Sequence, residues 1–168
     1  MSFAQSLLAE FESQVPVTRK FLERLPADKL TWRPHERSLS AGQLALHIAS
    51  VPGGVVRAAQ KNPVQAPEFK MPQPSSLQEI LGAFDESVAA VRDLLPKFDE
   101  TSMRETWRLL QGDKELVAVP RERFLRNVML NHWYQHRGQF SVYLRMLQVA
   151  VPASWGPSAD EPFQVIRA

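Results

Sequence analysis

Apolar residues recur at three- and four-residue spacing in four long stretches of the chain. These stretches are residues 2–25, the segment opened by Ser40, the segment opened by Ser76, and the segment that follows Pro120. Such spacing places the apolar side chains on one face of a helix. Both serines are followed three residues later by Gln or Glu, which is the capping-box pattern of a helix start. The pattern predicts four amphipathic helices around a shared core.

Prolines interrupt this helical pattern in three places. Pro16 is expected to bend the first helix, because proline lacks a backbone N–H and crowds the carbonyl four residues earlier. Pro52-Gly53-Gly54 lies within the second helix, which should either kink or end there. Residues 62–75 contain four prolines and little periodicity. They indicate a long crossover, so the third helix need not run antiparallel to the second.

Residues 98–119 carry the weakest pattern of the chain. Residues 106–110 and 116–119 flank Gly112-Asp113, which is typical of a short hairpin or an irregular turn. With no sustained series of strands, the fold class we predict is all-α. We expect a four-helix bundle in up-down-down-up order, with a long crossover between helices 2 and 3. A short hairpin before helix 4 is an open alternative to an irregular turn. A length of 168 residues suits a single domain, 1–168.

Composition and charge exclude several classes of function. The chain has no cysteine, which excludes thiolate nucleophiles, cysteine zinc sites and iron–sulfur clusters. A formal net charge of +2 provides no strong field for nucleic acid or anionic lipid, so we expect neither as a partner. No apolar run reaches the roughly 18 residues that span a bilayer, and residues 1–12 do not read as a secretory signal. A cytoplasmic location is the default expectation.

Histidine placement is the most informative chemical feature. His132 and His136 are four residues apart and leave the fourth predicted helix on the same side. His47 falls in phase with apolar residues of the second helix, so its ring should point into the bundle. Three such imidazoles could hold a divalent ion and leave a coordination position open. The alternative is three hydrogen-bonded core histidines, whereas His35 lies among charged residues and is expected to be solvated.

Two chemistries fit an open position on such an ion. A bound water could act as nucleophile or base, as in zinc hydrolases, or the ion could hold a small-molecule thiolate for transfer. Three adjacent acidic pairs are candidate hydrogen-bond acceptors for the ligating imidazoles; these are Asp85-Glu86, Asp99-Glu100 and Asp160-Glu161. The four tryptophans are interpreted as packing anchors. No Walker loop, dinucleotide fingerprint or Gly-x-Ser-x-Gly elbow is present.

The same histidines lie within motifs that resemble a known family. The motifs are Trp32-Arg33-Pro34, Ser40-Ala41-Gly42-Gln43-Leu44 leading to His47, the block Asn131-His132-Trp133-Tyr134-Gln135-His136-Arg137-Gly138-Gln139-Phe140, and Tyr143-Leu144-Arg145; Val151-Pro152 and residues 156–161 extend them. On these residues the chain resembles the DinB/YfiT-like superfamily of bacterial metal-binding helical bundles, in particular its DinB-like branch.

The resemblance implies a divalent metal held by His47, His132 and His136. Zinc, nickel and iron occur across the group, and many members are cytoplasmic homodimers, so the resemblance implies a homodimer here as well. Related branches transfer low-molecular-weight thiols, so a small-molecule thiol or electrophile is the implied partner. Two positions depart from the family pattern. Gln148 replaces a glycine after the fourth helix, and Pro52-Gly53-Gly54 replaces bulkier residues, which should open the wall beside His47.

These observations leave two hypotheses from different classes. In the first, the protein is a metal-dependent enzyme of the thiol S-transferase or hydrolase type. In the second, it is a noncatalytic stress-response binding module in which the ion only braces the helices. The sequence does not identify the catalytic residues, the metal or the substrate.

Overall fold

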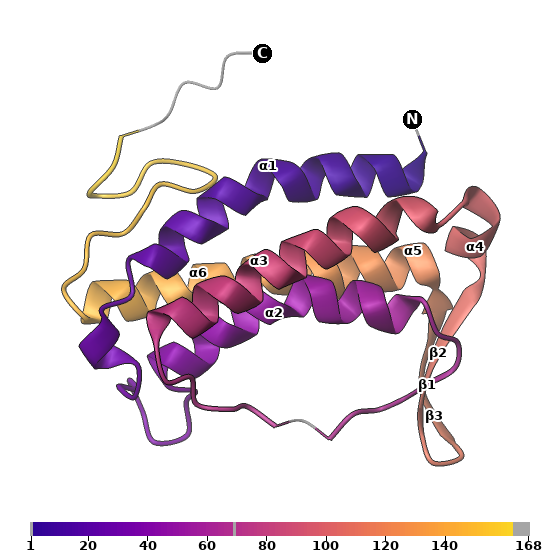
Figure 1. Cartoon of the computed structure of the whole chain (residues 1–168), viewed down its shortest axis with the longest axis horizontal. Helices are drawn as coiled ribbons and strands as arrows, with labels where there is room; N and C mark the ends of the chain where they lie inside the picture. Colours follow the sequence, from indigo (N-terminus) through magenta and orange to yellow (C-terminus); the bar gives the residue numbers. More distant parts are fainter. Residues whose placement is uncertain (1, 69, 163–168) are drawn as a thin grey trace.

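Four long helical segments lie side by side, and a small sheet stands at one end of them (Figure 1). The computed structural model describes residues 2–68 and 70–162. The long segments are α1 (Phe3–Glu23), α2 (Ala41–Ala59), α3 (Leu77–Leu94) and the continuous run of α5 (Arg121–Phe124), η3 (Leu125–Asn131) and α6 (His132–Met146). Three short helices connect them: η1 (Ala27–Lys29), η2 (Leu95–Lys97) and α4 (Glu100–Arg104). Within the described ranges, no helix combines the length and apolarity needed to cross a membrane.

The prediction of an all-α fold is wrong, because the chain also forms a three-stranded mixed sheet. Strands β2 (Thr106–Gln111) and β3 (Lys114–Pro120) pair antiparallel, and β1 (Val64–Gln65) pairs parallel with β2. Strand β1 is only two residues long, too short to show the alternation that identifies a strand. Its partner lies more than 40 residues further along the chain, at Leu109 and Leu110. The predicted alternative of a short hairpin around Gly112-Asp113 is confirmed by β2 and β3, whereas local patterning could not reveal β1 or the mixed sheet.

A buried tryptophan attaches the sheet to the helices. Trp107 of β2 is 1% exposed, and its indole N–H donates to the carbonyl of Lys61 at 2.9 Å, just beyond the end of α2. Its ring stacks on Phe124 of α5 with the centroids 3.7 Å apart. The sheet therefore fixes the end of α2 next to the beginning of the last helical run.

The connection from α2 to α3 crosses the length of the molecule, so these two helices run in the same direction (Figure 1). At the start of α2, both hydrogen bonds of the capping box between Ser40 and Gln43 are present. At the start of α3 only one bond of the predicted box forms. Ser76 accepts from the Glu79 N–H, whereas the Glu79 carboxylate accepts from the backbone N–H of Ser75.

Helix α2 continues through Pro52 to Ala59, so the alternative that it ends at this proline is wrong. Proline has no N–H, and the carbonyl of Ile48 therefore lacks its usual partner four residues later. The buried indole N–H of Trp133 in α6 donates to this carbonyl at 2.9 Å. A side chain of the neighbouring helix thus donates the hydrogen bond that Pro52 cannot give to the Ile48 carbonyl.

Gly53 allows α2 and α3 to pack closely. Its backbone N–H donates to the Ser87 hydroxyl at 2.7 Å, and a Cβ added at Gly53 would lie 2.7 Å from the Ser87 Cα. Gly53 therefore faces α3, and the expectation that this glycine opens the wall beside His47 is wrong. Gly54 has open space around it.

Helix α6 ends in a left-handed turn centred on Gln148, whose φ is 61°. The N–H of Val149 donates to the carbonyl of Leu144, and that of Gln148 to the carbonyl of Arg145. These two bonds are the Schellman arrangement, in which the left-handed position favours glycine. The missing family glycine is therefore replaced by a residue that adopts the same backbone conformation at a steric cost.

Gln148→Gly should stabilise the protein by about 0.5–1 kcal/mol, because glycine adopts the left-handed conformation without the steric cost that a Cβ imposes. The greater conformational entropy of glycine in the unfolded chain offsets part of this gain. Chemical denaturation measures the change in the free energy of unfolding. Gln148→Ala is the matched control and should give no comparable gain. Equal stabilisation by alanine and glycine would contradict this explanation.

Trp133→Phe should destabilise the protein by about 2–4 kcal/mol, because it leaves the Ile48 carbonyl without a donor and creates a cavity. Pro52→Ala supplies a backbone N–H to the same carbonyl. In the Pro52→Ala background, Trp133→Phe should therefore cost about 1 kcal/mol less. Denaturation of the four proteins of this double-mutant cycle measures the coupling, and strict additivity would show that the two features are independent.

Candidate metal centre

Three imidazoles from two helices converge at one point between α2 and α6. The Nε2 atom of His132 lies 3.1 Å from Nε2 of His47 and 2.8 Å from Nε2 of His136. One ring nitrogen of each histidine lies within 4.8 Å of the other two, and all three side chains are half-buried. The structure therefore brings together the three histidines singled out in the sequence.

The geometry of this cluster suits a shared cation. An imidazole nitrogen offers one in-plane lone pair or one N–H, so Nε2 of His132 cannot hydrogen-bond well to both neighbours at once. Metal–nitrogen bonds of about 2.1 Å place two ligand nitrogens about 3.0 Å apart at right angles and about 3.4 Å apart at tetrahedral angles. The two short separations lie close to the first value. One divalent ion fits this donor set.

The surroundings of His47 and His132 favour the neutral form of their imidazoles. Burial lowers the pKa of His47 to about 4, and the neighbouring His136 and His132 act in the same direction. Burial, followed by the influence of His136, also lowers the pKa of His132. A neutral imidazole is the form that binds a metal, so both side chains have the required protonation state near neutral pH.

Gln139 is positioned to orient His136. Its Oε1 lies 3.0 Å from Nδ1 of His136, one turn earlier on α6. When Nδ1 carries the proton and donates to this oxygen, the lone pair of Nε2 points into the cluster. Gln139 belongs to the His-Arg-Gly-Gln part of the sequence motif, but spacing alone did not assign it this role.

The acidic pairs considered in the sequence do not serve the histidines. Asp85 pairs with Arg19, Asp99 caps α4 through the Ser102 N–H, and Glu161 pairs with Lys20 and Arg24. Within residues 2–68 and 70–162, no carboxylate is hydrogen-bonded to any of the three imidazoles. His35 is exposed and accepts from the Arg37 N–H, outside the cluster as expected.

A π-helical segment precedes the two histidines of α6. Residues Leu125–Asn131 form it, and the N–H of His132 donates to the carbonyl of Asn127, five residues earlier. This winding changes the register between α5 and α6, so the face predicted from an uninterrupted α-helix does not continue across it. Such segments are frequent at functional sites.

A pocket of about 270 Å³ opens beside His47. Leu46, Met71 and Pro72 provide apolar walls, and Gln43 and Ser50 provide polar groups. The side-chain amide of Gln43 donates to the carbonyl of Met71 at 2.8 Å, which holds the long crossover against α2. The crossover therefore forms one wall of a space where a small molecule could reach His47.

Solved structures share this fold. A DinB-like protein from Bacillus cereus ATCC 10987 superimposes with a TM-score of 0.72 at 22% identity, covering 89% of this chain and 96% of that chain. The DinB-like protein YjoA from Bacillus subtilis gives a TM-score of 0.65 at 20% identity, covering 88% of this chain and 96% of that chain. At these identities the likeness concerns the fold alone.

Sequence comparison identifies the family. YrdA, an uncharacterised protein of Bacillus subtilis (strain 168), is 26% identical over 156 residues, which are 92% of this chain and 89% of YrdA. The sequence profile of the DinB superfamily matches residues 10–140. Because this match covers most of the chain, the protein belongs to the DinB superfamily.

Proposed function

We propose that this protein is a metal-dependent enzyme that transfers a small-molecule thiol to an electrophile, with a divalent ion held by His47, His132 and His136. The observation that carries the proposal is the convergence of three Nε2 atoms beside a pocket. Nε2 of His132 lies 2.8 Å from Nε2 of His136 and 3.1 Å from Nε2 of His47. Three neutral ligands also leave the ion's double charge uncompensated, which favours an anionic fourth ligand.

A bound divalent ion would supply Lewis acidity, keeping a coordinated thiol in its thiolate form near neutral pH. The protein's own residues would provide the rest. Gln139 holds the tautomer of His136, and the apolar side chains of Leu46 and Met71 exclude water from one side of the pocket. Gln43 keeps the crossover wall in place.

The donor set favours a thiol over water as the nucleophile. Hydrolytic zinc sites commonly pair the bound water with a carboxylate base. The described residues place no carboxylate in hydrogen-bond contact with the three histidines. A thiolate needs no such base at the moment of attack. In the transfer, a sulfur–carbon bond forms, the bond from carbon to the leaving group breaks, and the thiol proton passes to solvent.

Saturating zinc or nickel should raise the melting temperature of the protein by about 5–10 °C, because an ion at about 100 times its Kd adds about 2.7 kcal/mol to the stability of a protein of this size.

Alanine at any of the three histidines should lower metal affinity at least about tenfold, measured by calorimetric titration. His35→Ala is the matched control, since His35 is exposed and outside the cluster. Unchanged metal affinity in the three cluster variants would refute the site.

Gln139→Leu should lower metal affinity about 10- to 100-fold, because the hydrogen bond that orients His136 is lost. Gln135→Leu tests the same change at an exposed position one turn earlier on α6. It should leave the affinity unchanged. Equal losses in both variants would point to a general effect on the helix instead of on His136.

Turnover distinguishes catalysis from bracing. The metal-loaded protein should accelerate the reaction of monochlorobimane with a low-molecular-weight thiol, followed by fluorescence, and chelation should abolish this rate. His35→Ala should retain it and His132→Ala should lose it. If chelation lowers the melting temperature but no thiol gives turnover, the ion is structural and the binding-module hypothesis replaces the enzyme.

A further inference from the structure

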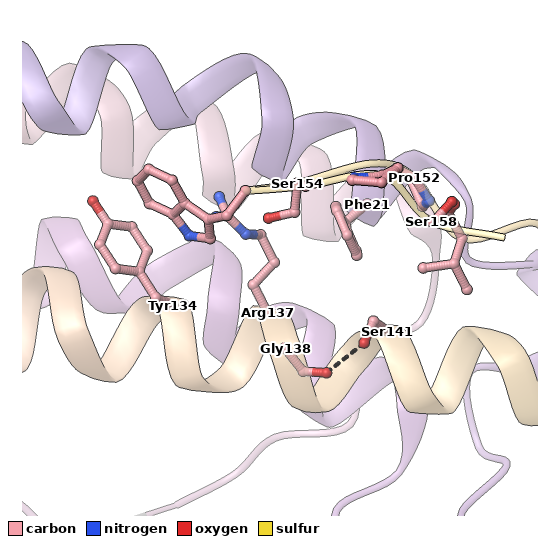
Figure 2. A pocket seen from close by; sticks show the side chains of 12 residues that line it. Phe21, Tyr134, Arg137, Gly138, Ser141, Pro152, Ser154 and Ser158 are labelled. Carbon is pink, nitrogen blue, oxygen red and sulfur yellow. Dashed lines mark hydrogen bonds between the residues drawn. The ribbon is translucent and has the colours of Figure 1, made fainter. Parts of the chain in front are cut away.

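A second pocket lies between α1, α6 and the segment 151–158 that follows α6 (Figure 2). Its volume is about 310 Å³, within the range of small-molecule sites. None of the three histidines lines it. Figure 2 shows Arg137 rising from α6 towards the 151–158 segment, between Tyr134 on one side and Phe21 on the other.

Arg137 is a buried cation without a counter-charge among the described residues. It is 2% exposed, and its guanidinium donates only to neutral oxygens, those of Thr18 at 3.1 Å and Gln14 at 2.9 Å. The other buried arginine, Arg121, has the carboxylate of Glu105 at 3.1 Å. The rings of Phe21, Tyr134 and Trp155 lie 6.0, 5.4 and 6.0 Å from the guanidinium carbon. These cation–π contacts offset only part of the cost of burying an unpaired charge, so Arg137 is poorly explained as packing alone.

The guanidinium has further donors for a ligand. Arginine carries five N–H groups in a planar fork, and the two bonds to α1 use one on each terminal nitrogen. The described chain provides no acceptor for the others. Because the bonds to Gln14 and Thr18 fix the plane of the guanidinium, its orientation is set before a ligand arrives. A planar fork matches a carboxylate through two parallel bonds.

The pocket walls suit a flat apolar group attached to that carboxylate. Phe21, Val151 and Pro152 line one part of the pocket, and Tyr134 and Trp155 line another. Trp155 is 64% exposed, contrary to the expectation that every tryptophan is a packing anchor. Its ring lies edge-on to Tyr134, with the centroids 5.5 Å apart, and 6.0 Å from the Arg137 guanidinium carbon. An exposed aromatic ring is thus held at the pocket beside a buried cation.

The segment that carries Trp155 is firmly held in place. Asp160 accepts from the Val151 N–H at 2.8 Å, and Glu161 accepts from the Ala153 N–H at 2.9 Å. Glu161 also pairs with Lys20 of α1 at 2.6 Å. The acidic pair Asp160-Glu161 therefore fastens the loop to α1 through Lys20 and to α6 through Arg145. Its negative charges are used in these bonds and do not neutralise Arg137.

We propose that this pocket binds a small aromatic carboxylate, whose charged group pairs with Arg137 and whose ring packs against Trp155 and Tyr134. The site is separate from the histidine cluster and does not depend on the proposed thiol transfer.

Benzoate tests the site, with the metal-loaded full chain as the protein and calorimetric titration as the measurement. Benzoate should bind at least about tenfold more tightly than benzamide, which has the same shape but no charge. It should also bind more tightly than inorganic phosphate. Equal affinity for benzoate and benzamide, or preference for phosphate, would overturn the proposal.

Variants test whether Arg137 binds the carboxylate or only stabilises the fold. Arg137→Gln should lower benzoate affinity at least about tenfold, and Arg123→Gln, an exposed control, should not change it. Because loss of Arg137 could unfold the chain, Trp155→Ala provides a second test. This exposed residue can be removed without emptying the core, and benzoate affinity should fall about fivefold.

His132→Ala excludes carboxylate binding to the metal. This variant lacks one proposed metal ligand but retains every residue that lines the pocket. It should bind benzoate as the parent protein does. Loss of benzoate binding in His132→Ala, together with full binding in Trp155→Ala, would place the carboxylate at the histidines and refute the pocket.

Discussion

One hydrogen bond between α2 and α6 sets the position of the histidine cluster. The indole of Trp133 donates to the carbonyl of Ile48. His132 and His47 are the residues immediately before these two partners, so the bond fixes their backbones one residue from the bonded groups. The carbonyl is available because Pro52 cannot donate to it. Stacking of Trp133 on Phe11, with the centroids 5.1 Å apart, secures the indole from the α1 side. A proline that looked like a helix break thus contributes to the site.

The parts of the molecule that follow from local periodicity could be predicted from the sequence. Helix starts at Ser40 and Ser76 depend on residues three positions apart, and the capping bonds found there confirm both starts. At the second start the Glu79 carboxylate accepts from the Ser75 N–H instead of the Ser76 N–H. The convergence of His47 with His132 and His136 was likewise predictable in outline. Each histidine shares a helical face with core residues, and buried faces of neighbouring helices must meet.

Features that depend on distant partners could not be predicted in this way. Strand β1 exists only because β2 is beside it, and two residues carry no pattern. Gly53 looked like a gap beside His47 until the position of Ser87 was known. The burial of Arg137 is likewise not visible in its own helix, because α1 and the segment 151–158 enclose it. In each case the decisive contact lies on another element of the fold.

The π-helical winding of residues 125–131 has a consequence for how this protein tolerates changes in length. Bonds that reach five residues back accommodate one more residue than an α-helix of the same span. A single deletion there can convert the winding to α-helix without rotating the rings that follow. One residue can therefore be lost within this segment while α5 on one side and the imidazoles of α6 on the other keep their orientation.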